Sequence, residues 1–151
     1  EMVGFALIII VVAVIILVFL GFAMKNTGDT DTPNYEVESF LQATLQYTTD
    51  CEDYSGYLSV QKLIFECERD RAWLDKRNSC EVLNSTLENL VKESWKVEED
   101  RPIKGYFLNI TSDGEELLSI SNGNFTKNSK WAFQDFSRSG NSINIAFTAY
   151  Y

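Results

Sequence analysis

The segment from Met2 to Met24 reads MVGFALIIIVVAVIILVFLGFAM and contains no charged side chain. Its apolar residues occupy every side of a helical wheel, so the pattern leaves no polar face to turn towards water. As a helix, the segment would be about 35 Å long, which is enough to cross the hydrocarbon layer of a membrane. The sequence therefore predicts a long apolar helix over residues 1–25, surrounded by lipid or by other apolar helices.

The charges around this segment are reversed relative to an ordinary membrane anchor. Glu1 is the only charged residue before it, and Lys25 is the first basic residue after it. The cytoplasmic end of an anchor usually carries Lys or Arg. We expect that a short basic leader preceded Glu1 and was removed on the cytoplasmic side, leaving the apolar segment in the mature protein. A fragment of a larger protein would explain the same start.

The opening residues Glu1–Val12, EMVGFALIIIVV, resemble the mature N-terminus of type IV pilin-like proteins, and more closely that of the archaeal branch. The resemblance implies an apolar helix that moves from the membrane into the core of a helical filament. Bacterial members usually have glutamate at the fifth mature position, where this chain has Phe5, so the bacterial role of that glutamate is not carried over. The region after Cys51 also resembles archaeal pilins, in Cys67, Ser79–Asn84 and Ile103–Tyr106.

Small side chains are spread along the apolar segment and would let neighbouring helices approach closely. Glu1 would be the one ionisable side chain inside a filament core, where we expect it, or the amino group, to pair with another subunit. The residues expected to shape this assembly helix are Glu1, Gly4, Phe5, Ala6, Ala13, Gly21 and Ala23.

A polar spacer separates the apolar segment from a head domain. Residues 26–34, NTGDTDTPN, are turn formers and small polar residues without an apolar side chain, and we expect a linker there. Residues 35–151 are long enough to bury a core of their own. We expect this head domain on the outer side of the membrane.

The head divides by its apolar periodicity into a helical half, residues 35–101, and a sheet half, residues 102–151. Apolar residues recur at spacings of three and four in three segments, and each segment is predicted to be a helix. The first runs from residue 35 to about Thr48, the second begins after a cap at Ser59, and the third begins after a cap at Ser79. A loop is expected from Asp50 to Tyr57. After Pro102 the period changes to two, which predicts a four-stranded antiparallel meander with one face packed on the helices. The predicted fold class is α+β, as the pilin resemblance also implies.

Three cysteines, Cys51, Cys67 and Cys80, lie in the helical half, and outside a membrane a pair would oxidise. Cys51 with Cys80 is the favoured pair, because each lies near a helix end where the backbone can adjust. Cys67 lies on an apolar helix face and is the alternative partner. Spacing does not fix the connectivity, so all three pairings stay open.

Three sequons are candidate glycosylation sites, at Asn84, Asn109 and Asn124. The pattern arises often by chance in a chain this rich in Asn, Ser and Thr. Asn109 is expected on the polar face of a strand and Asn124 in a loop, where both would be reachable. Surface pilins of archaea are commonly glycosylated, so the resemblance strengthens this expectation.

Four acidic clusters occur, and Ca²⁺ binding is conceivable in two of them, but neither has the full set of oxygen ligands of a calcium hand. Solvated loops are the favoured interpretation. The clusters are Asp29/Asp31, Asp50/Glu52/Asp53, Glu98/Glu99/Asp100 and Asp113/Glu115/Glu116. The aromatic residues Trp95, Trp131, Tyr150 and Tyr151 favour core or subunit contacts over a carbohydrate platform, and the pattern does not separate these cases.

Composition excludes several functions. The chain has 13 basic and 22 acidic residues, a net charge of −9, and such a balance does not suit a nucleic-acid ligand. It has no histidine, so it has no Ser-His or Cys-His pair and no imidazole metal ligand. We therefore expect no enzyme, no catalytic or metal site and no cofactor.

The sequence thus favours a structural protein, a homo-oligomeric subunit of an extracellular type IV pilus-like filament on the cell surface that serves adhesion or attachment. The precursor would be inserted in the membrane before assembly. The alternative is a single-pass membrane-anchored extracellular binding module.

Overall fold

The computed structural model describes residues 10–18, 34–69, 77–138 and 140–151. The chain divides into two compact units, Glu1–Thr32 and Pro33–Tyr151. The division falls within residues 26–34, the segment predicted to be a linker. In the described residues the architecture is α+β, with four helices and two antiparallel sheets.

The prediction of a long apolar helix at the N-terminus is wrong. Within the described part of residues 1–25, the helix covers only residues 10–18. Valine and isoleucine dominate this stretch, and their β-branched side chains have a lower helix propensity than leucine or alanine.

Three helices of the head have polar caps that fix where they begin. Asn34 caps α2 (Tyr35–Gln46) by accepting a hydrogen bond from the Glu36 N–H at 2.9 Å. Ser59 caps α3 (Val60–Glu68), as the sequence predicted. The cap of α4 (Ser79–Ser94) is Asn78, not Ser79, because the Asn78 side chain accepts from two backbone N–H groups of the first turn.

The predicted loop from Asp50 to Tyr57 is wrong, because most of it is a β-hairpin. Strand β1 (Thr48–Asp53) pairs antiparallel with β2 (Gly56–Ser59). Gly56 has a φ of +116°, a conformation that favours glycine after this tight turn. The hairpin escaped prediction because β1 is the polar sequence TTDCED, in which only Thr49 and Cys51 are buried.

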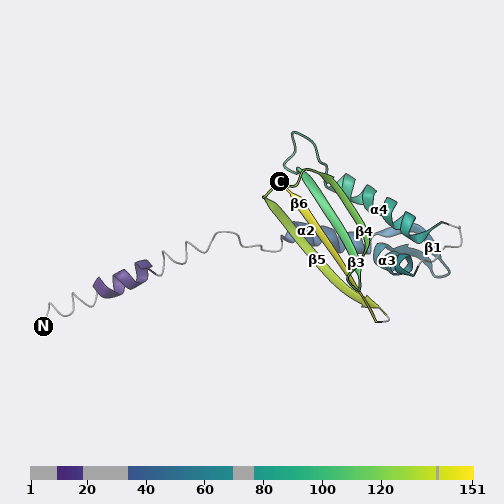
Figure 1. Cartoon of the computed structure of the whole chain (residues 1–151), viewed down its shortest axis with the longest axis horizontal. Coiled ribbons are helices and arrows are strands. Elements are labelled where there is room, and N and C mark those ends of the chain that lie inside the picture. The colour runs from purple at the N-terminus through teal and green to yellow at the C-terminus, as the bar shows by residue number, and fades with distance from the viewer. Residues whose placement is uncertain (1–9, 19–33, 70–76, 139) are drawn as a thin grey trace. The chain divides into compact units, whose positions relative to one another are not determined.

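The second sheet is four-stranded and antiparallel, but it is not the predicted meander (Figure 1). Its strands are β3 (Gly105–Ser112), β4 (Glu115–Gly123), β5 (Ser129–Arg138) and β6 (Asn141–Tyr150), in the order β4-β3-β6-β5. The two central strands, β3 and β6, have every second residue fully buried over much of their length. The more polar strands β4 and β5 occupy the edges, where one side of each strand meets solvent.

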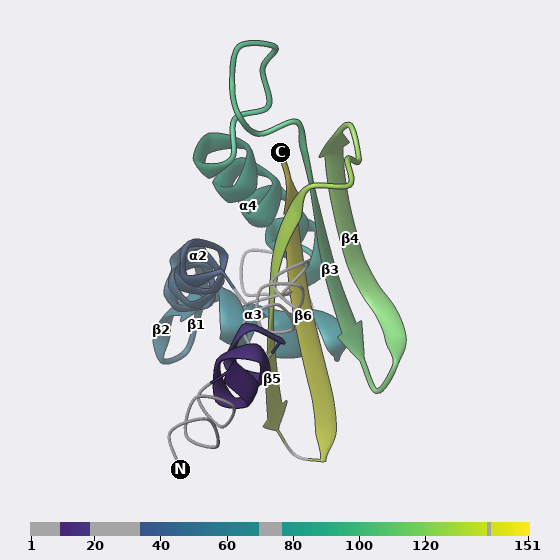
Figure 2. The ribbon, with the colours of Figure 1, turned by 90° about the vertical axis from the view of Figure 1, so that its left-hand side faces the viewer.

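Helices α2, α3 and α4 all lie on one side of this sheet, as Figure 2 shows. The core fills the space between them. Phe147 of β6 lies at its centre with no exposed surface, and its ring is 5.1 Å from the rings of both Phe40 and Trp95. None of these three helices covers the opposite side of the sheet.

Candidate functional site

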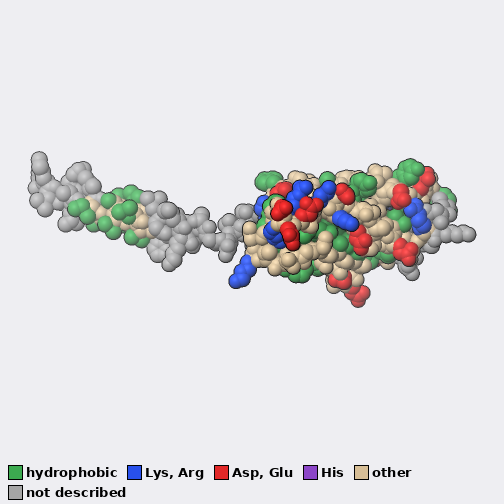
Figure 3. Space-filling model, turned by 90° about the horizontal axis from the view of Figure 1, so that it is seen from above, with side chains coloured by type: hydrophobic (Ala, Val, Ile, Leu, Met, Phe, Trp, Pro, Cys, Tyr) green, Lys and Arg blue, Asp and Glu red, His purple; other side chains and the backbone are tan. Residues whose placement is uncertain are grey.

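Residues 10–18, the described part of the apolar segment, expose their apolar side chains. The large side chains of residues 10–18 are 48–68% exposed, and Figure 3 shows hydrophobic side chains along the visible face of this stretch. Ala13 lies on it. The other predicted assembly residues are outside the described residues, namely Glu1, Gly4, Phe5, Ala6, Gly21 and Ala23. None of the helices in the described part of the chain has the length and hydropathy that a membrane span requires.

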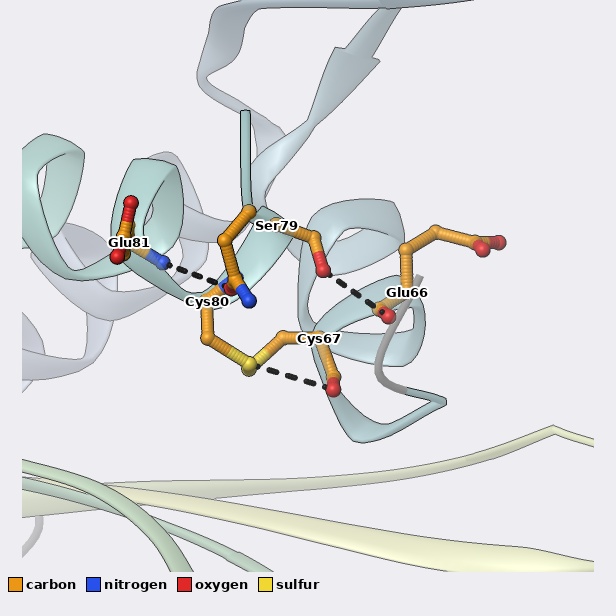
Figure 4. Close-up of a disulfide and its surroundings, with 6 residues drawn as sticks. Glu66, Cys67, Ser79, Cys80 and Glu81 are labelled. Atoms are coloured by element: carbon orange, nitrogen blue, oxygen red, sulfur yellow. Dashed lines mark hydrogen bonds between the residues drawn. A yellow bond between two sulfur atoms is a disulfide. The ribbon is translucent and has the colours of Figure 1, made fainter. Parts of the chain in front are cut away.

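The favoured disulfide, Cys51 with Cys80, is wrong, because the structure joins Cys80 to the alternative partner Cys67 (Figure 4). Cys67 lies in the last turn of α3 and Cys80 in the first turn of α4, with 4.6 Å between their Cα atoms, a distance that a disulfide spans. Next to it, the Ser79 hydroxyl donates to the Glu66 carbonyl at 3.2 Å. Cys51 is buried on β1 and lies outside this disulfide.

We expect the double variant Cys67→Ser/Cys80→Ser to lose about 3 kcal/mol of unfolding free energy. The disulfide closes a loop between residues 13 positions apart, and removing it releases that constraint on the unfolded chain. Chemical denaturation followed by circular dichroism measures the loss. A reducing agent should destabilise the wild type to the same extent and leave the double variant unchanged. A double variant as stable as the oxidised wild type, or one still sensitive to reductant, would contradict this account.

Several carboxylates of the acidic clusters are engaged in local contacts. Asp50 forms an ion pair with Arg77 at 2.8 Å, and Asp53 accepts hydrogen bonds from both the hydroxyl and the backbone N–H of Ser55. These bonds from Ser55 hold the pKa of Asp53 below its usual value. The described residues contain no group of three or more His, Cys, Asp or Glu side chains placed to hold a metal ion. Asp29 and Asp31 lie outside the described residues.

The three sequon asparagines have different surroundings. Asn84 is half-buried on α4, and its amide donates to Glu88 at 3.0 Å. Asn109 lies on β3, and its amide donates to Glu116 at 3.0 Å. Asn124 is exposed in the connection from β4 to β5, so it is the most accessible of the three. Glycosylation at each position stays a prediction.

The aromatic residues that the sequence left unassigned divide into two groups. Trp95 is buried in the core, with its ring 5.4 Å from that of Phe40. Tyr151 is half-buried beneath Lys130, and burial raises the pKa of its phenol, with a further contribution from the carboxylate of Glu36. Trp131 and Tyr150, in contrast, belong to the side of the sheet opposite α2, α3 and α4.

The strand register places the side chains of this side in rows across the sheet. We name this surface the open face. One row joins Trp131, Thr148, Phe107 and Ser121, the next joins Phe133, Ala146, Asn109 and Ser119, and a third joins Asp135, Asn144, Thr111 and Glu116. Beyond the first row lie Tyr150 and the adjoining Phe125. The alternate residues of β3 and β6 point into the core and are buried.

Aromatic rings cluster at one end of the open face. The rings of Trp131 and Phe133 are 5.8 Å apart and within 20° of parallel, and those of Phe125 and Tyr150 are 5.0 Å apart. Phe133 is 55% exposed and Phe125 64% exposed. Gly105 allows the loop that carries Phe125 to lie this close, because a Cβ on Gly105 would come within 2.6 Å of the Asn124 carbonyl oxygen.

Sequence reasoning missed this cluster. Trp131 and Phe107 come into one row only through the pairing of β5 with β6 and of β6 with β3, and Phe125 reaches Tyr150 from the connection between β4 and β5. The available signal was the pair Trp131 and Phe133 two positions apart, since such residues share one face of a strand.

Comparison with protein-family models, with curated proteins and with solved structures finds no match to this chain.

Proposed function

We propose that this chain is a structural subunit of a type IV pilus-like surface filament, which assembles with identical copies through its apolar N-terminal segment. The observation that carries the proposal is the apolar surface of residues 10–18, the described part of its unit, whose large side chains are about half exposed or more on every side. The head, in contrast, buries a core of its own. Attachment to surfaces is the role we assign to the filament.

The chemistry of the segment supports assembly among copies. Side chains that are apolar on every side need apolar surroundings, which either a membrane or other copies of the segment provide. Lipid already satisfies the hydrophobic effect, so moving from membrane to filament must gain its free energy from close packing and from contacts between heads. The small residues along the segment permit that close approach. The membrane is thus the site of the precursor, and the filament on the cell surface is the final location.

Electron microscopy of the purified chain tests the proposal. After removal of detergent, we expect uniform thin filaments that contain only this chain. The same preparation in detergent should be dispersed, because detergent covers the apolar segment. Material that stays monomeric or forms irregular aggregates under all conditions, and that is found as monomers in the cell membrane, would overturn the proposal. That result would favour the anchored extracellular binding module.

A further inference from the structure

We propose that the outer edge of strand β4 pairs antiparallel with the same strand of a second copy, so that two heads share one continuous sheet. The pairing concerns the head alone and does not depend on assembly through the N-terminal segment. Its starting point is that β4 is an end strand, and β3 is its only partner among the strands that the structure describes. The outward backbone N–H and C=O groups of such a strand are a template for pairing with another chain.

The other end strand, β5, is protected in ways that β4 is not. Helix α2 packs against β5, and Lys130 of β5 forms an ion pair with Glu36 of α2 at 3.6 Å. β5 also carries Asp135 and Arg138, and charged side chains on an end strand discourage pairing with another chain. In β4, the stretch Leu118–Gly123 reads LSISNG and contains no charge and no proline. β4 lies on the side of the sheet farthest from α2, as Figure 2 shows.

The stretch is self-complementary when two copies run antiparallel. The irregularity in the β3–β4 ladder lies before Leu118, so the residues that follow continue as a regular strand. A pairing centred on Ile120 places the two Ile120 side chains opposite each other, on the side of the sheet that faces the core. Ser119 of each copy then lies opposite Ser121 of the other, on the open face. Apolar pairs and hydroxyl pairs across strands both stabilise a sheet.

The symmetry of Ser119-Ile120-Ser121 about its middle residue is the observation that points to an identical copy as the partner. A two-fold contact uses the same surface from both copies, so each group must meet a suitable group of the same stretch. Here serine meets serine and isoleucine meets isoleucine. A strand of a different protein would have to supply this complement independently.

Charge selects the antiparallel arrangement. The two acidic residues of β4, Glu115 and Glu116, are at its start. In the register centred on Ile120, the two Glu116 residues are about 27 Å apart along the strand direction, because eight positions separate them. That separation exceeds the screening length of about 8 Å at physiological ionic strength, so their repulsion is small. A parallel pairing in register would instead place the same glutamates side by side, which is destabilising.

The symmetry of the contact also determines where it can occur. A two-fold contact relates copies whose β4 strands point in opposite directions. In a filament whose copies all run one way, it would therefore join copies of different filaments and not neighbours within one filament. This consequence rests on the proposed function, whereas the pairing of two heads does not. The two are tested separately, since pairing is measured in detergent and assembly by the formation of filaments.

Sedimentation velocity of the whole chain in mild detergent tests the pairing, because detergent covers the apolar segment and leaves the heads free to associate. We expect the wild type to form dimers. The variant Ser119→Lys/Ser121→Lys should associate at least roughly tenfold more weakly, because the pairing would place lysine directly opposite lysine. Both serines are exposed, so the head should stay folded, which circular dichroism checks.

A charge exchange locates the contact. Ser119→Glu/Ser121→Glu should also fail to dimerise alone, but an equimolar mixture of the lysine and glutamate variants should form dimers, since opposite charges then face each other. Ser129→Lys/Ser137→Lys is the matched control, because it adds the same charge at two exposed serines of the other end strand, and it should dimerise as the wild type does.

Three results would overturn the proposal. A wild type that stays monomeric in detergent over the whole accessible concentration range would show that the edge of β4 does not bind a second copy. A lysine variant that dimerises as strongly as the wild type would place the contact elsewhere on the head or in the apolar segment. A mixture of the lysine and glutamate variants that stays monomeric would exclude the register centred on Ile120.

Discussion

Replacing Phe147 with alanine is expected to lower the free energy of unfolding of the head by about 3–5 kcal/mol. The Phe147 side chain has no exposed surface. The centre of its ring is 5.1 Å from the ring centres of Phe40 and Trp95 and 6.2 Å from that of Tyr106. These three rings come from α2, from the end of α4 and from β3, so the cavity would lie where the helices meet the sheet. The surrounding rings are large and cannot collapse fully into the empty space.

Chemical denaturation of the whole chain in mild detergent, followed by tryptophan fluorescence, measures this loss. Phe133→Ala is a matched control on the opposite side of the same sheet. Because the Phe133 side chain is 55% exposed, its removal is expected to cost less than about 1 kcal/mol. Equal losses in the two variants would show that burial against the helices is not what stabilises the head.

Leucine in place of Gly4 or Gly21 is expected to abolish or distort filaments while leaving the head as stable as in the wild type. Both glycines belong to the apolar segment and lie outside the described residues. In an apolar environment, small residues allow neighbouring chains to approach closely, and the added side chain would hold the chains apart. The head is a separate unit beginning at Pro33, so its folding should not change.

Electron microscopy of each variant measures filament formation, and denaturation of the same sample measures head stability. Leu7→Ile is the control within the segment, because it conserves volume and apolar character and should leave filaments normal. Normal filaments from both glycine variants would rule out close packing through these residues as the source of assembly free energy. A glycine variant with an unfolded head would instead show that the two units are coupled.

The helices of the head could be predicted because their signals are local. Residues Leu83, Leu87 and Val91 recur at spacings of four and are all fully buried on α4. The N-terminal cap of α4 was predicted one residue too late, at Ser79 instead of Asn78. Both residue types are good caps, and only the structure shows which side chain accepts the N–H groups of the first turn. The length of the N-terminal helix was overestimated, because hydropathy reports burial in an apolar environment and does not by itself fix helical length.

The pairing of distant elements could not be predicted, because it depends on contacts that leave no local pattern. Cys67 reaches Cys80 because the end of α3 meets the start of α4, which the spacing of the cysteines does not reveal. The meander was wrong for the same reason, since β3 pairs with β6 as well as with β4. The open face follows from that register, so the sequence offered only the local pair Trp131 and Phe133 and not the cluster across strands.

The position of β6 in the sheet determines when the head can fold. This strand is the latest in the chain, yet it lies between β3 and β5 and is hydrogen-bonded to both. Until residues 141–150 have been synthesised, β5 has no partner strand and β3 has only β4. The pairing of β6 with β3 joins distant segments, and such pairings form slowly and only after the intervening chain is available. The sheet therefore completes after translation has passed its final strand, and a chain truncated before Asn141 would retain only the β3–β4 hairpin of this sheet.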